Sequence, residues 1–126
     1  MFDKTLVQKA LSHSLSPVNK SGWTNDTCDS LVSLLIHDIF GGEILKTHKK
    51  RGWHFYNRIN GERIDLVSAQ LKKAKEVNGF EDLPSTPEET LNYIAQEDYS
   101  TFQARFIGAF EEEVGLENYN SPVILA

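Results

Sequence analysis

The sequence predicts an α+β fold in which a small antiparallel sheet packs against helices, and three observations support this prediction. Residues 53–67 have the pattern of a β-hairpin around Asn60-Gly61. An apolar stripe over 28–39 has helical spacing, and further helical patterns lie on both sides of these two segments. Because the strand patterns are grouped in the middle of the chain and do not alternate with helices, an antiparallel sheet is favoured.

The composition is that of a soluble globular protein. Its 126 residues suit a single domain over 1–126, with 40% hydrophobic and 25% charged residues. A net charge of −5 gives no electrostatic basis for binding nucleic acid or an anionic membrane. A single cysteine excludes an internal disulfide, and the sequence contains no recognisable signal peptide or membrane span. A cytoplasmic protein is therefore expected.

Two helices are predicted before the strands. Asp3 can cap the first helix, which should end near Ser14 because Pro17 disfavours a helical residue before it. The second can begin at any of three capping residues over 25–27 and should end at Gly41-Gly42. Its unbroken stripe predicts a central, buried helix. The stripe consists of Cys28, Leu31, Val32, Leu35, Ile36 and Ile39.

The hairpin follows a short predicted strand over 43–47. Asn60-Gly61 fits a two-residue type I′ turn, because both positions need positive φ. This turn places Arg58 opposite Arg63 and Tyr56 opposite Asp65. One face of the hairpin then carries His54, Tyr56, Arg58, Arg63, Asp65 and Val67. The other face is mostly apolar and should cover a core; it carries Trp53, Phe55, Asn57, Ile59, Ile64 and Leu66.

Three further helices are predicted after the hairpin. The first spans 68–77. A turn over 83–87 leads into the second, which begins at the capping box Thr86-Pro87-Glu88-Glu89 and carries Leu91, Ile94 and Ala95. The third spans about 98–114, presents an aromatic stripe and ends at Gly115. The apolar tail beyond it can add an edge strand.

Three side chains supply the parts of a thiol-dependent catalytic site. Cys28 lies in the first turn of the buried helix, where the helix dipole and unpaired backbone N–H groups lower the pKa of a thiol and can hold an oxyanion. His54 and Asp65 are diagonal neighbours on one face of the hairpin, with Cβ atoms about 7 Å apart, so the carboxylate can orient the imidazole. Further candidates, for contact with a substrate or an oxyanion, are Asn25, Trp23 and Tyr56.

Each of these residues also has a structural interpretation. Cys28 lies on the apolar stripe, and a lone buried cysteine is a common small core residue. His54 could be a strand residue bonded to Tyr56 or Asp65, and Asp65 could balance the arginines on the same face. The sequence has neither a phosphate-binding glycine loop nor a spaced set of metal ligands, so no cofactor and no metal are expected.

Four segments carry a resemblance to a known family. They are Thr27-Cys28, His37-Asp38-Ile39-Phe40-Gly41-Gly42-Glu43-Ile44-Leu45, Gly52-Trp53-His54-Phe55-Tyr56-Asn57-Arg58, and Ile64-Asp65-Leu66 with Gln70-Leu71 beyond. Over these segments, within about residues 20 to 72, the chain resembles the bacterial YunG-like family of uncharacterised small proteins. The resemblance implies a papain/transglutaminase-like layout, with Cys28 as nucleophile, His54 as base and Asp65 as the orienting acid.

The leading functional hypothesis is a thiol-dependent hydrolase or acyl transferase that acts on an amide or thioester-type bond. Hydrolysis, deamidation and acyl transfer all begin with attack by a thiolate, so the sequence leaves them open, together with the oligomeric state. One alternative is a non-catalytic binding or regulatory module on the same fold, with Cys28 as a packing residue. A weaker one is a small-molecule binder that uses the cleft between the cysteine-bearing helix and the hairpin. The expected partner is a protein, a peptide or a small amide.

Overall fold

The structure is a computed structural model that describes residues 2–18, 25–50, 52–66 and 79–119. The described elements are α1 (Lys4–Val18), α2 (Asn25–Phe40), β1 (Glu43–His48), β2 (Trp53–Ile59), β3 (Glu62–Ile64), β4 (Leu83–Ser85), α4 (Pro87–Thr90), the 3₁₀ turn η1 (Leu91–Tyr93) and α5 (Gln96–Tyr119). The strands form an antiparallel sheet in the order β3-β2-β1-β4. The predicted α+β class is therefore confirmed. The helix predicted over 68–77 and the edge strand predicted in the tail lie outside the described residues.

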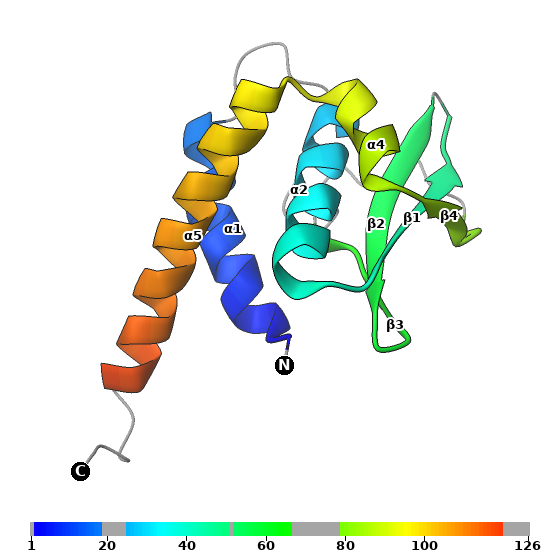
Figure 1. Ribbon diagram of the computed structural model, residues 1–126. Helices are drawn as coiled ribbons and strands as arrows, with labels where there is room; N and C mark the ends of the chain where they lie inside the picture. Colours follow the sequence, from blue (N-terminus) through cyan, green and yellow to red (C-terminus); the bar gives the residue numbers. More distant parts are fainter. Residues whose placement is uncertain (1, 19–24, 51, 67–78, 120–126) are drawn as a thin grey trace.

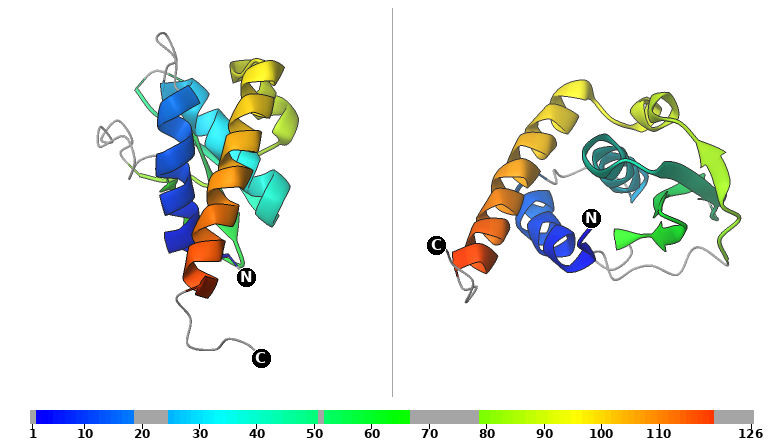
Figure 2. Two further views of the ribbon diagram at one scale, coloured as in Figure 1. Left: turned by 90° about the vertical axis from the view of Figure 1, so that its left-hand side faces the viewer. Right: turned by 60° about the horizontal axis from the view of Figure 1, so that its bottom comes forward.

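Helix α2 lies between the sheet and the helix pair α1 and α5 (Figure 1). It packs on β2, while α1 packs along α5. Figure 2 shows the same arrangement from two further directions. One apolar cluster joins the three helices, and it includes Leu11, Leu35 and Phe102. A second joins α2 to the sheet through Leu34, Ile44 and Phe55. The apolar stripe of α2 is thus buried, as its spacing predicts.

The hairpin between β2 and β3 has the predicted turn and register. Asn60 and Gly61 have φ values of 51° and 81°, and Arg58 pairs with Arg63. The ladder is shorter than predicted, because β3 ends at Ile64 and the described pairs do not extend to Asp65. The predicted Val67 position lies outside the described residues.

The end of α2 sets the position of β1 beside β2. Gly41 and Gly42 have φ values of 84° and 83°, which confirms the predicted left-handed helix end. A Cβ atom on Gly42 would lie 2.6 Å from the backbone oxygen of Arg58 on β2. Glycine is therefore needed here both for the backbone conformation and for the close approach of the two segments.

Several predicted element boundaries are wrong. Helix α1 does not end near Ser14 but continues to Val18, because a proline in the last turn removes only one N–H group. Helix α5 runs through Gly115 to Tyr119, since a single glycine costs only about 1 kcal/mol in a helix.

The segment predicted as a turn and the helix after it also differ from the prediction. Residues Leu83–Ser85 form β4, which pairs with the outer edge of β1, a position where Pro84 is tolerated. The predicted cap at Thr86 is present, because its Oγ1 accepts a hydrogen bond from the Glu89 amide at 3.2 Å. The helix that follows is only a short turn of α4 and then η1, which ends before Ile94.

Candidate functional site

The candidate site centres on His54, whose side chain is buried and bound through both ring nitrogens. Its Nε2 lies 2.8 Å from Oδ2 of Asp65, and its Nδ1 lies 2.7 Å from Oδ2 of Asp29. The two carboxyl groups raise the pKa of the ring to about 9, so at neutral pH the ring is an imidazolium and both of its nitrogens donate. His54 therefore has no nitrogen available to take a proton from a third group.

Three different segments contribute these side chains. His54 lies on β2, Asp65 directly follows β3, and Asp29 lies one turn into α2. Ser33 shares a helix face with Asp29, and its backbone oxygen accepts a hydrogen bond from the Asn57 side chain of β2 at 2.9 Å. Together with the hydrogen bond between His54 and Asp29, this contact joins α2 to β2.

The two carboxylates determine the charge of the imidazole. Burial lowers the pKa of the His54 ring, but the hydrogen bonds and negative charges of Asp29 and Asp65 outweigh it and raise that pKa to about 9. Burial in turn raises the pKa of the Asp29 carboxyl, an effect that the hydrogen bond from His54 and the charge of Lys49 oppose. At neutral pH the cluster is held together by a protonated ring between two acids.

Cys28 lies on a different face of α2 from Asp29. Adjacent helical residues are about 100° apart around the axis, and the Cys28 side chain, 3% exposed, packs in the cluster that contains Val7 and Leu11 of α1. Within the described residues, no hydrogen bond joins its Sγ to His54. Burial and then the charge of Asp29 raise the pKa of the Cys28 thiol to about 11, so it is a neutral thiol at pH 7.

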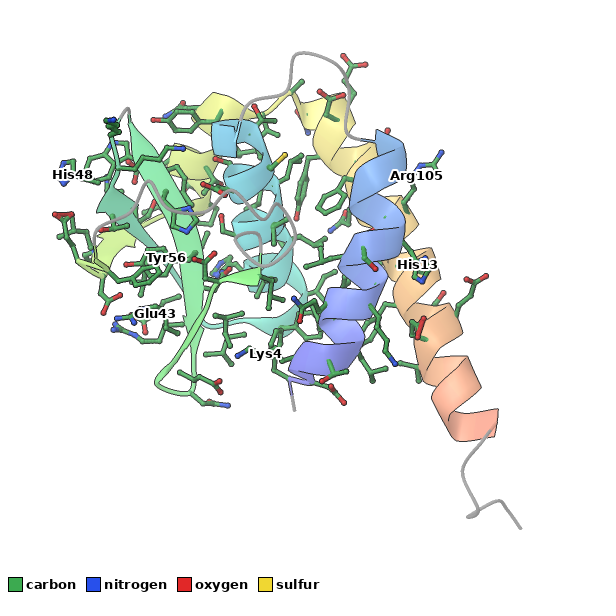
Figure 3. The ribbon with its side chains drawn as sticks, turned by 180° about the vertical axis from the view of Figure 1, so that it is seen from behind. Lys4, His13, Glu43, His48, Tyr56 and Arg105 are labelled. Atoms are coloured by element: carbon green, nitrogen blue, oxygen red, sulfur yellow. The ribbon has the colours of Figure 1, made fainter. Side chains whose placement is uncertain are left out.

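The segment 79–82 lies near the rings of His54 and Tyr56. The ring of Phe80 lies 6.3 Å from the His54 ring and 4.9 Å from the Tyr56 ring. The Tyr56 hydroxyl donates to Asp82 Oδ1 at 2.9 Å and accepts from the Asp82 amide at 2.8 Å. Figure 3 shows Tyr56 on the sheet between His48 and Glu43. Tyr56 thus holds segment 79–82 against the sheet.

The structure brings together two of the three side chains in the predicted triad. The contact between His54 and Asp65 is present, as the hairpin faces predict, whereas Cys28 lies in the helical core. Trp23 lies outside the described residues, and Asn25 begins α2 with a side chain that the structure does not describe. The catalytic roles of all these residues stay predictions.

Asp29 is the site residue that the sequence interpretation missed. It directly follows Cys28 and lies off the apolar stripe, with Ser33 one turn later on the same face. A polar face inside an otherwise buried helix was the available signal, because buried polar side chains need partners. It did not indicate which partner Asp29 would meet.

The family comparison agrees with the resemblance in the sequence. A family model described as "YunG protein" matches residues 4–111. The chain belongs to the YunG family. A YunG relative, the "Uncharacterized protein YunG" of Bacillus subtilis (strain 168), is 35% identical over an alignment of 105 residues that covers 79% of this chain and 88% of that protein. No solved structure matches the chain, so the papain/transglutaminase-like part of the expected layout stays a prediction.

Two further findings concern the described ranges of this YunG protein. They contain no group of three or more histidine, cysteine or acidic side chains arranged to hold a metal ion. None of their helices combines the length and the apolar character needed to cross a membrane.

Proposed function

We propose that the chain is a non-catalytic binding or regulatory module of the YunG family. The observation that supports this proposal is the bonding of His54, whose two ring nitrogens are both bound to carboxylates. Cys28 then serves as a core residue between α1, α2 and α5. The cluster of Asp29, His54 and Asp65 ties α2 to β2 and to the end of β3, and so stabilises the fold of the module. A protein, peptide or small amide as the ligand and a cytoplasmic location stay predictions from the sequence.

The rival function is the thiol-dependent hydrolase or acyl transferase. The contact of 2.8 Å between His54 and Asp65 favours it, because a catalytic base needs an orienting acid. It also requires a Cys28 thiolate within reach of His54. A buried thiol with a pKa of about 11 does not supply that thiolate at neutral pH. The geometry therefore supports the non-catalytic module better.

Alkylation of the folded protein distinguishes the two functions. The chain has a single cysteine, so one mass addition by iodoacetamide reports on Cys28 alone. We expect no addition to the folded protein at pH 7 and full addition in denaturant, because the thiol is both protonated and enclosed. An activity-based thiol probe should likewise label wild type no more than Cys28→Ser.

Rapid labelling of the folded wild-type chain at pH 7, absent in Cys28→Ser, would contradict the proposal and restore the thiol-dependent enzyme. The denatured sample is the matched control, because it shows that the reagent reacts fully when the same sulfur is accessible.

A further inference from the structure

The two ring nitrogens of His54 each face one acid, and this geometry can be compared with that around a catalytic base. In a nucleophile–base–acid triad, one nitrogen of the imidazole faces an orienting acid and the other faces the nucleophile. Here Nε2 faces Asp65 at 2.8 Å, the side chain to which the sequence gives the orienting role. The remaining nitrogen, Nδ1, faces Asp29 at 2.7 Å. The side chain in the nucleophile's place is thus a carboxylate.

We propose that Asp29, one position beyond Cys28, occupies the nucleophile position of a Cys–His–Asp triad geometry. In this arrangement His54 has the position of the base and Asp65 that of the orienting acid. The carboxylate of Asp29 lies where a thiol would react. This inference rests on the proposed non-catalytic function. It identifies Asp29 as the side chain that takes the place of a thiol nucleophile next to His54.

The placement of α2 supports Asp29 over its neighbours. Helix α2 is bound to β2 both by the contact of Asp29 with His54 and by a hydrogen bond from Asn57 to the backbone oxygen of Ser33. Cys28 is directed to the cluster of α1 and α5, and among the described residues no hydrogen bond joins its Sγ to His54. The side chain of Asp29 is 2% exposed and hydrogen-bonded to His54, and these contacts fix its position.

The chemical consequence follows from the difference between the two groups. A thiol can give its proton to an imidazole and become a strong nucleophile, whereas a carboxyl group in the same place supplies a much weaker nucleophile toward an amide or thioester bond. Asp29 instead keeps the His54 ring protonated. A cysteine at position 29 would restore the transfer: its proton would pass from Sγ to Nδ1 of His54, giving a thiolate and an imidazolium, with no other bond made or broken.

The test places a single thiol at three consecutive positions of α2. The variants are wild type (Cys28), Cys28→Ser combined with Asp29→Cys, and Cys28→Ser combined with Ser30→Cys. Ser30 is fully buried, so it is a matched position beside Asp29. The pH dependence of the far-ultraviolet thiolate absorbance measures the pKa of each thiol without requiring access by a reagent. Circular dichroism establishes that each chain is folded.

Of the three thiols, we expect only the one at position 29 to ionise early, with a pKa of about 6. The ordinary thiol pKa is about 8.5. Adding His54→Gln to that variant should remove the low-pH thiolate. A thiol at position 29 that ionises no earlier than those at 28 and 30 would overturn the inference. So would an early ionisation that persists in His54→Gln.

Alkylation of Cys28 in the wild-type chain tests the proposed function separately. Its result does not depend on the pKa of a thiol at position 29. If the cysteine variant does not fold, Cys28→Ser combined with Asp29→Ser takes its place, and nuclear magnetic resonance of the His54 ring nitrogens is the measurement, because position 29 is 2% exposed and closed to a probe. Once the ring is neutral at high pH, we expect Nε2 to keep the proton that it donates to Asp65, while Nδ1 is unprotonated and accepts a hydrogen bond from the serine hydroxyl. A neutral ring with its proton on Nδ1 would overturn the inference.

Discussion

Replacing His54 with glutamine is expected to lower the free energy of unfolding at pH 7 by about 3–5 kcal/mol. The change removes the imidazolium to which both Asp29 and Asp65 are hydrogen-bonded in the buried cluster. Breaking a buried ion network by removing one member is costly, because the remaining charges keep their desolvation penalty. Urea unfolding followed by circular dichroism measures the change.

His48→Gln is the matched control for this prediction. His48 is also a strand histidine bound to an acid, Glu81, but its side chain is 63% exposed. Exposed ion pairs contribute about 0–1 kcal/mol, so His48→Gln should change stability little. Equal losses in the two variants would show that the buried carboxylates do not depend on His54.

The stability of the wild-type protein is expected to fall as pH rises from about 6.5 to about 9. The folded-state pKa of His54, about 9, is above its ordinary value of 6.5. Folding therefore favours the protonated ring: this contribution is fully present below about pH 6.5 and is lost as pH rises through the folded-state pKa. A shift of this size corresponds to about 3 kcal/mol.

Urea unfolding of wild type and His54→Gln over this pH range isolates the contribution. The difference between the two proteins should shrink toward pH 9 and beyond. Cys28, whose pKa is raised to about 11, destabilises both proteins equally at high pH and cancels in the difference. A difference that stays constant from pH 6 to pH 10 would exclude a histidine that titrates in this window.

The parts of the fold that follow from local rules could be predicted from the sequence. Asn60-Gly61 requires one kind of turn, and that turn fixes which residues of the hairpin share a face. The contact between His54 and Asp65 follows from those faces. The apolar stripe of α2 likewise determined that the helix is buried, because helical periodicity identifies a face without any knowledge of its partners.

The parts that depend on distant contacts could not be predicted. Leu83–Ser85 becomes a strand because the edge of β1 is available to pair with it, which a local turn pattern does not reveal. Asp29 contacts His54 because of the way α2 is rotated about its own axis where it packs on β2. A local sequence pattern does not specify that rotation. The same apolar stripe that assigned Cys28 to the core argued against its role as a nucleophile. The reactivity of a thiol in the first turn of a helix, together with the family resemblance, favoured Cys28 over the carboxylate beside it.

The central claim is that His54 is an imidazolium held between Asp29 and Asp65, and nuclear magnetic resonance of its ring nitrogens tests this most directly. In the folded protein at pH 7, both Nδ1 and Nε2 are expected to carry a proton, and the ring should titrate with a pKa of about 9. A neutral ring at pH 7, with one nitrogen unprotonated, would contradict the account and leave a base available for catalysis.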